Sequence, residues 1–347
     1  MTNLPLAKLI IFCTGLFTLS GGLTFMVRGY AINRRIFDVP NHRSLHSVPT
    51  PRGGGLAFVA VFLGALVFLY LTGTIPKDIF MALAGGGGLV AAVGWADDNR
   101  GAAPGIRLLC HGVAAVWGVM WLGGYPAMSW GGGIWNLSWA GGALAVLGTV
   151  WMINLYNFMD GIDGIAGTEA VTAAAIAGVL LYFTGHPGMA LICVALALSV
   201  GGFLIWNWPP ARIFMGDVGS GFLGFTFACL AMASENSGAL PVLVWAVLLG
   251  VFIVDATVTL IRRFINKEKL YEAHRTHVYQ LAAQAEFSHK QVTLGVLFLN
   301  ICLGMIGAAL MKWPGWLLPG AALTAVILTI IEVRLYYRFS QNEENTG

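Results

Sequence analysis

The chain has 347 residues, of which 57% are hydrophobic and 10% are charged, and its mean hydropathy is +0.76. This composition lies outside the range of soluble globular domains and indicates an integral membrane protein. The net charge of +3 is too small to indicate nucleic acid as a partner, and no basic run is interleaved with aromatic residues. The five cysteines lie in apolar segments without CxxC spacing, which predicts neither disulfide bonds nor a thiolate metal site.

Eleven apolar segments have the length that a helix needs to cross a bilayer, about 20 residues. They are residues 5–27, 54–73, 79–96, 105–124, 138–157, 165–184, 189–206, 220–236, 239–261, 292–311 and 314–335. With a periplasmic amino terminus, sixteen lysines and arginines lie on the cytoplasmic side and only Lys8, Lys77 and Lys312 lie outside. We therefore predict an all-α polytopic membrane protein with about 11 transmembrane helices and a cytoplasmic carboxyl terminus. No linker or low-complexity tract divides the chain, so residues 1–347 are expected to form a single domain.

Most of the polar chemistry falls in five predicted cytoplasmic loops, residues 29–53, 97–104, 158–164, 207–219 and 262–291. The first of them, DVPNHRSLHSVPTPRGGG, carries His46 and Arg52 among three prolines. A rigid loop with basic side chains suits the binding of an anionic substrate. The alternative is an ordinary positively charged cytoplasmic loop.

The second loop begins with GWADDNRG, where Asp97 and Asp98 are adjacent. Two carboxylates at about 4 Å repel each other by roughly 4 kcal/mol at an effective dielectric constant near 20, so the pair needs a cation or a shared proton. Magnesium suits an all-oxygen site that substrate phosphates complete. Alternatively, both acids are solvated and one is paired with Arg100.

The third loop lies within WMINLYNFMDGIDGIAG, where an apolar segment ends in four polar side chains at Asn154, Asn157, Asp160 and Asp163. Positions 154, 157 and 160 would share one face of a helix, and the three glycines at 161, 164 and 167 would let the chain turn closely around a ligand. Two amides and two carboxylates without a lysine or arginine favour a functional site over a simple polar helix end.

The fourth loop contains FMGDVGSGFLG, with Asp217 and Ser220 at the start of the next apolar segment. The free amides of a helix start could receive an anion, and Asp217 could join the acidic cluster around a metal ion. The alternative is that both residues only cap the helix.

The last loop contains HRTHVYQ, in which Arg275 and His277 could hold a diphosphate. A metal site at His274 and His277 is the weaker alternative, because the carboxylate-rich loops favour magnesium. Asp255 and Arg262 lie seven residues apart on one helix face, which favours an internal ion pair that orients this loop.

Together, the loops predict acids, basic groups and glycine-rich turns at the cytoplasmic membrane boundary. A reaction between a lipid phosphate and a soluble nucleotide requires this combination. A secondary transporter is the main alternative, although transporters place their sites near the membrane midplane. A second alternative is a non-catalytic assembly component, which would bind without turnover.

The ordered motifs DVPNHRSLHSVPTPRGGG, WADDNRG, NLYNFMDGIDGIAG, FMGDVGSGFLG, DATVTLIRR and HRTHVYQ resemble the polyprenyl-phosphate N-acetylhexosamine-1-phosphate transferases, the glycosyltransferase 4 family. The resemblance implies a multi-pass enzyme of the bacterial cytoplasmic (inner) membrane. It would transfer a sugar-1-phosphate from a UDP-N-acetylhexosamine to undecaprenyl phosphate, release UMP and use Mg²⁺, with Mn²⁺ as an alternative ion. Homodimer formation is left open.

The resemblance also implies roles for individual residues. Asp97 and Asp98 match the family's acidic pair, one of them a candidate base, and Asp217, together with Asp98, is the expected magnesium ligand. Asn157, Asp160 and Asp163 match the nucleotide loop, and Arg275 with His277 matches the phosphate-binding signature. Because HRTHVYQ lacks the denser histidine cluster of some relatives, the resemblance favours enzymes that initiate O-antigen or other surface polysaccharides over the pentapeptide translocase.

Overall fold

The computed structural model of the chain describes residues 6–40, 45, 48–269, 275–285 and 287–346. Its helices are α1 (Leu6–Arg34), α2 (Gly55–Leu71), α3 (Lys77–Met81), α4 (Gly87–Arg100), α5 (Pro104–Leu122), α6 (Ser138–Phe158), α7 (Ile165–Phe183), α8 (Pro187–Asn207), α9 (Asp217–Asn236), α10 (Val242–Leu248), α11 (Gly250–Ile265), α12 (Val278–Ala285), α13 (His289–Lys312) and α14 (Leu317–Thr346). A π-helical turn, Ala82–Gly86, joins α3 to α4, and a 3-10 turn, Pro314–Trp316, precedes α14.

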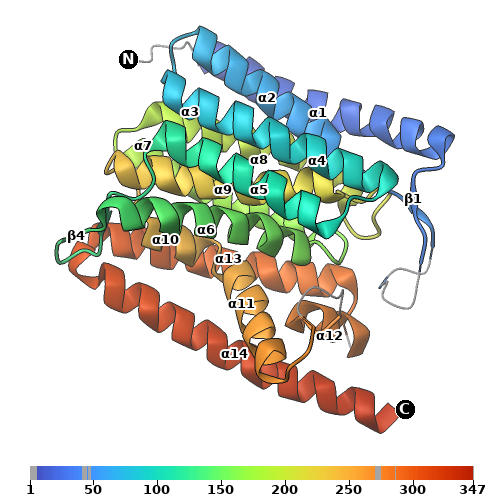
Figure 1. Cartoon of the computed structure of the whole chain (residues 1–347). Coiled ribbons are helices and arrows are strands. Elements are labelled where there is room, and N and C mark those ends of the chain that lie inside the picture. The colour runs from blue at the N-terminus through green and yellow to red at the C-terminus, as the bar shows by residue number, and fades with distance from the viewer. Residues whose placement is uncertain (1–5, 41–44, 46–47, 270–274, 286, 347) are drawn as a thin grey trace.

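Two short antiparallel hairpins lie at opposite ends of the helical bundle (Figure 1). Strand β1 (Phe37–Asp38) pairs with β2 (Thr50–Pro51), and β3 (Ala127–Ser129) pairs with β4 (Ile134–Asn136). The first hairpin spans the first predicted cytoplasmic loop, and the second lies in the stretch between α5 and α6.

The helices account for the predicted apolar segments. Within the described residues, nine helical segments are long and apolar enough to cross a membrane. Each predicted segment overlaps a helix, but Gly55–Leu71 has only 17 residues, and the predicted span 239–261 is not one straight helix. It is broken at Leu249 into α10 and α11, which meet at 82°, so that α11 leaves the bundle at a steep angle (Figure 1). The fold is a multi-pass helical membrane protein, and the count of eleven spans and the orientation of the termini stay predictions.

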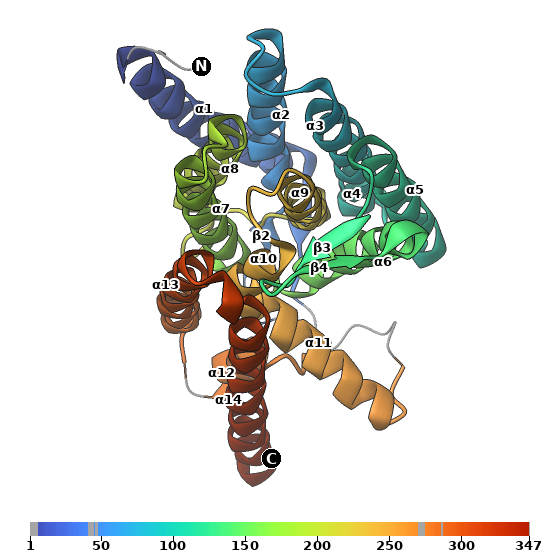
Figure 2. The ribbon, with the colours of Figure 1, turned by 90° about the vertical axis from the view of Figure 1, so that its left-hand side faces the viewer.

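Helix α9 forms the centre of the bundle, where α2, α4 and α6 pack around it (Figure 2). Every residue from Val218 to Glu235 is buried, and these side chains include phenylalanines together with several small residues. An apolar helix that is enclosed on all sides has no lipid-facing surface, so its position is set by packing against its neighbours.

Glycines allow the neighbours of α9 to approach its backbone closely. A Cβ atom on Gly55 of α2 would lie 2.5 Å from the Cα of Gly219, and a Cβ on Gly94 of α4 would lie 2.5 Å from the Asp217 carbonyl oxygen. Gly86 and Gly87 allow the same close packing, because a Cβ atom on either glycine would overlap the ring of Phe225 or Phe222 of α9. The first turn of α9 is thereby fixed against α2 and α4.

Gly55→Ala should therefore destabilise the fold, because its methyl group overlaps the backbone of α9. We expect a loss of about 1–3 kcal/mol of folding free energy, measured as a lower melting temperature in detergent. Gly64→Ala on the same helix is the matched control, because nothing lies within 4 Å of a Cβ atom placed at that glycine. Equal melting temperatures for the two variants would contradict this account of the packing.

Candidate active site

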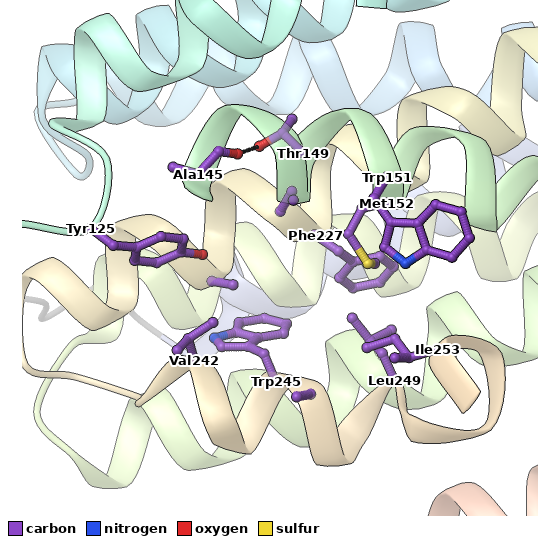
Figure 3. A pocket seen from close by; sticks show the side chains of 14 residues that line it. Tyr125, Ala145, Thr149, Trp151, Met152, Phe227, Val242, Trp245, Leu249 and Ile253 are labelled. Atoms are coloured by element: carbon purple, nitrogen blue, oxygen red, sulfur yellow. Dashed lines mark hydrogen bonds between the residues drawn. The ribbon is translucent and has the colours of Figure 1, made fainter. Parts of the chain in front are cut away.

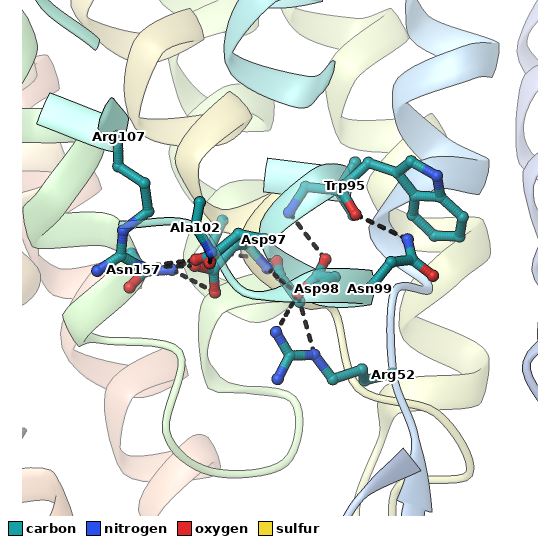
Figure 4. Close-up of polar contacts among 12 residues, drawn as sticks. Arg52, Trp95, Asp97, Asp98, Asn99, Ala102, Arg107 and Asn157 are labelled. Carbon is teal, nitrogen blue, oxygen red and sulfur yellow. Dashed lines mark hydrogen bonds and ion pairs between the residues drawn. The ribbon is translucent and has the colours of Figure 1, made fainter. Parts of the chain in front are cut away.

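The buried carboxylate of Asp98 joins the first hairpin to the start of α9. Its Oδ1 accepts hydrogen bonds from Arg52 Nε at 3.0 Å and Arg52 Nη2 at 2.6 Å (Figure 4), and also from the Asp217 amide at 3.0 Å. Its Oδ2 accepts from the Val218 amide at 3.2 Å. The side chain is 0% exposed, so Asp98 itself occupies the helix start that the sequence suggested for a substrate anion.

Glycine at position 216 makes this cap possible. Gly216 has φ +77°, and a Cβ there would lie 2.5 Å from Oδ2 of Asp98. The ion-pair partners of the two adjacent aspartates also differ from the partner considered in the sequence, which was Arg100. Asp98 pairs with Arg52, and Asp97 pairs with Arg107.

Arg107 bridges two carboxylates. Its Nη1 lies 2.6 Å from Oδ2 of Asp97 and 3.2 Å from Oδ2 of Asp217, and Asp97 also accepts from the Ala102 amide. Asn157 Nδ2 donates to Oδ1 of Asp217 at 2.9 Å and to Ser220 Oγ at 3.0 Å. The close-up in Figure 4 shows Arg107, Asp97 and Asn157 converging. Three predicted loops thus meet in one hydrogen-bonded network.

Asp160 lies beside this network but outside it. Helix α6 ends at Phe158, so residues 154, 157 and 160 do not share a helix face as expected, and Asn154 donates to the Val150 carbonyl of its own helix. Among the described residues, the Asp160 carboxylate has no hydrogen bond or ion pair. Burial raises the pKa of Asp160 well above its ordinary value, and the charges of Asp217, Asp98 and Asp163 raise it further.

Asp163 connects the third loop to the fourth loop and to α13. Its Oδ2 accepts from the Ala211 amide at 3.0 Å, and its Oδ1 lies 3.3 Å from His289 Nδ1. Thr293 donates to its carbonyl oxygen at 2.9 Å. No sequence pattern points to His289, because it lies at the start of a late apolar segment, 126 positions from Asp163.

His277 is buried against α11 and is 2% exposed. Its Nδ1 lies 3.0 Å from Oδ1 of Asp255, whose carboxylate also accepts from the amides of Val278 and Tyr279. The expected pair of Asp255 with Arg262 is therefore wrong. Arg262 donates instead to the Thr276 carbonyl at 2.6 Å, so both residues hold the last loop separately.

Tyr279 connects the last loop to the third loop. Its hydroxyl donates to the Phe158 carbonyl at 2.8 Å, and a Cβ on Gly161 would overlap that hydroxyl oxygen. Gly161 therefore leaves space for the Tyr279 side chain, whereas the sequence suggested that it leaves space for a ligand. Arg275 precedes α12 and its carbonyl accepts from Gln284, whereas His46 lies outside the described residues.

An apolar cavity of about 220 Å³ lies between α6, α9, α10 and α11 (Figure 3). The labelled side chains of Phe227, Trp245 and Met152 line it, and Thr149 turns its hydroxyl back to the Ala145 carbonyl. Its α6 lining ends at Met152, five residues before Asn157. The apolar space therefore lies deeper along α6 and α9 than the polar network.

The possible metal ligands in the network are mostly oxygen atoms, which hard cations such as Mg²⁺ prefer. Within the described ranges, no group of three or more His, Cys, Asp or Glu side chains is spaced as a complete metal site. The side chain of Asp217 is 27% exposed, whereas the Asp98 carboxylate is enclosed by its four donors. A metal ion would therefore need ligands from a substrate, and Asp217 is accessible to it.

The fold and the site define a polytopic membrane protein with a polar, carboxylate-rich site at the ends of its helices. The model of glycosyl transferase family 4 matches residues 80–235. A probable undecaprenyl-phosphate N-acetylglucosaminyl 1-phosphate transferase of Bacillus subtilis is 26% identical, over 85% of this chain and 83% of that protein. An undecaprenyl-phosphate alpha-N-acetylglucosaminyl 1-phosphate transferase of Yersinia pestis is 28% identical, over 90% of this chain and 88% of that protein.

A decaprenyl-phosphate N-acetylglucosaminephosphotransferase of Mycobacterium tuberculosis is 30% identical, over 78% of this chain and 74% of that protein. The chain belongs to the polyprenyl-phosphate N-acetylhexosamine-1-phosphate transferase family. These matches do not favour the transporter alternative.

The raised pKa of Asp160 yields a pH-dependent stability prediction. A carboxyl group whose pKa is higher in the folded state than in the unfolded state destabilises the fold as pH rises above its ordinary value of about 4. Asp160→Asn should therefore melt at a higher temperature than the wild type near pH 8, and this difference should vanish towards about pH 4. Melting curves in detergent across this range test it, and a lower melting temperature for Asp160→Asn near pH 8 would contradict it.

Proposed function

We propose that the protein transfers N-acetylhexosamine-1-phosphate from a UDP-N-acetylhexosamine to undecaprenyl phosphate and releases UMP. The observation that supports this most strongly is the network that joins Asp97, Asp217 and Asn157 through Arg107, with an apolar cavity deeper along α6 and α9. The names of the relatives supply the acceptor class and favour N-acetylglucosamine as the sugar. The reaction would begin the synthesis of a lipid-linked surface polysaccharide of the O-antigen type at the bacterial inner membrane.

In this reaction, an oxygen of the lipid phosphate attacks the β-phosphorus of the donor. The bond from that phosphorus to the bridging oxygen breaks, and UMP leaves with the bridging oxygen. The product is a polyprenyl diphosphate that carries the sugar. Direct attack needs no covalent aspartyl intermediate, so one transition state must be stabilised by groups that are already in place.

The side chains have separate roles in this proposal. Asp98 and Arg52 position the start of α9 and thereby Asp217, and Asn157 orients the Asp217 carboxylate through its amide. Arg107 lies within reach of the same carboxylates and can place positive charge near a bound diphosphate. Asp163 and His277 hold the third and last loops around the nucleotide.

A divalent cation fits this site, and we propose Mg²⁺. Asp217 would hold it together with Asp160, which has no partner among the described residues. When bound, Mg²⁺ would neutralise diphosphate charge. Asp98, the second ligand expected from the family resemblance, makes four hydrogen bonds that favour a positioning role. Asp97, which is less enclosed, is the better candidate for the base that deprotonates the lipid phosphate.

The apolar cavity is proposed to hold isoprene units further along the acceptor chain, because its lining on α9 begins at Phe227, ten residues after Asp217. Ala231 lines it from α9, so Ala231→Phe should lower kcat/KM for undecaprenyl phosphate by about tenfold, because the larger side chain excludes the prenyl chain. A short-chain prenyl phosphate should be affected much less. Ala175→Phe, on the exposed face of α7, is the control and should leave both values unchanged. An equal loss for both acceptors would contradict this assignment.

The mechanism predicts different outcomes for two isosteric changes. Asp217→Asn should reduce UMP release by at least about a thousandfold without lowering the melting temperature, since it removes charge from the reacting site. Asp98→Asn should reduce both activity and melting temperature, because the partly buried Arg52 loses its counter-charge. UMP release with Mg²⁺ or EDTA and thermal melting measure the two effects. Near-wild-type turnover in both variants would overturn the mechanism, and binding of donor without any turnover by the wild type would favour the assembly-component alternative.

A further inference from the structure

A second cavity, of about 330 Å³, is lined by Asp255, the residue that holds His277. Helices α11, α12, α13 and α14 line it, and Figure 2 shows α14 running past α11 and α12. Most of the wall is aliphatic or aromatic, with Val296, Leu328 and Phe339 among its lining residues. Two carboxylates also line it, Asp255 and Glu332, and no lysine or arginine does so in the described part of the chain.

Glu332 is the unusual residue of this cavity. It is 5% exposed, and neither of its carboxylate oxygens has a hydrogen-bond partner. Burial of a carboxyl group without a donor is energetically costly, so such groups are normally paired. A proton, or a ligand that enters the cavity, would supply the missing hydrogen bonds.

The polar groups near Glu332 are the hydroxyl of Thr259 and the positive charge of Arg262, and both also have other partners. The hydroxyl of Thr259 lies 3.3 Å from Oδ1 of Asp255. The guanidinium of Arg262 donates to the Thr276 carbonyl and lies 3.4 Å from the centre of the Tyr336 ring. His277 also faces Asp255 through Nδ1. Thr259 and Arg262 are both near the Glu332 carboxylate, but neither of its oxygens has a hydrogen bond among the described residues.

We propose that this cavity binds a membrane amphiphile through a primary ammonium head group, with Glu332 as its acceptor. Two carboxylates without a lining cation favour a positively charged head, and its N–H groups would satisfy the two unpaired oxygens. The apolar wall formed by Val296, Leu299 and Leu328 would accommodate an acyl chain. A phospholipid with a primary amine in its head group combines both features.

Occupancy of this cavity would also affect the residues that Asp255 holds. The same carboxylate lines the cavity and holds His277 and the amides of Val278 and Tyr279. A bound ammonium beside Glu332 would reduce the repulsion between the two carboxylates. The amphiphile would thereby stabilise the last loop, whether or not the protein carries out the proposed transfer.

Two lipids that differ only in their N–H groups test this proposal. The delipidated full-length protein is titrated in detergent with phosphatidylethanolamine or with phosphatidylcholine of the same acyl chains, and binding is followed by native mass spectrometry and thermal melting. We expect phosphatidylethanolamine to bind about tenfold more tightly and to raise the melting temperature, because only its ammonium can donate to Glu332. Neither measurement requires catalytic activity, so failure of the proposed transfer would not affect it.

Substitutions in the cavity test whether Glu332 is responsible for the preference for phosphatidylethanolamine. Glu332→Gln should remove the preference, whereas Asp78→Asn, which removes the same charge at an exposed carboxylate of α3, should retain it. Leu335→Trp narrows the cavity while keeping Glu332, and it should weaken binding of the lipid even if Glu332→Gln fails to fold. Equal affinity for the two lipids, an unchanged preference in Glu332→Gln, or equally tight binding of free ethanolamine would overturn the proposal.

Discussion

The arrangement of the site depends on the contact between Asp98 and the start of α9. Arg52 and two backbone amides direct four hydrogen bonds to one buried carboxylate, so the first hairpin, α4 and α9 are joined at a single point. A negative charge at a helix start is stabilised by the helix dipole and by the free amides of the first turn. Because Asp217 is the first residue of α9, this contact also fixes the position of the more exposed carboxylate beside it.

The remaining acids are held in place against their mutual repulsion. Arg107 lies between Asp97 and Asp217, and the raised pKa of Asp160 reflects burial together with the surrounding negative charge. Clustered carboxylates of this kind lower the stability of the protein unless a cationic ligand is bound. Functional sites often carry such a cost in stability. In the proposed reaction, Asp217 and Asp160 would hold a divalent cation, whose charge would offset this repulsion.

The sequence predicts the fold well where hydropathy decides it, and each predicted apolar segment overlaps a helix. The break at Leu249 was not predictable, because α10 and α11 are both apolar and their 82° angle depends on packing against other helices. The motifs predict that Asp97, Asp217 and Asn157 converge, since all lie where apolar segments begin or end on one side of the membrane. The partners within the site were not predictable, because the chain separates Arg52 from Asp98 by 46 positions and Asp255 from His277 by 22.

The central claim is that the group transferred to the lipid is a sugar phosphate. Mass spectrometry of the lipid fraction, after incubation of the purified protein with undecaprenyl phosphate, a panel of UDP-N-acetylhexosamines and Mg²⁺, tests it most directly. The account predicts an undecaprenyl diphosphate that carries one N-acetylhexosamine, formed in equal amount to the released UMP. A lipid monophosphate glycoside formed with release of UDP, or no modified lipid with any donor, would contradict it.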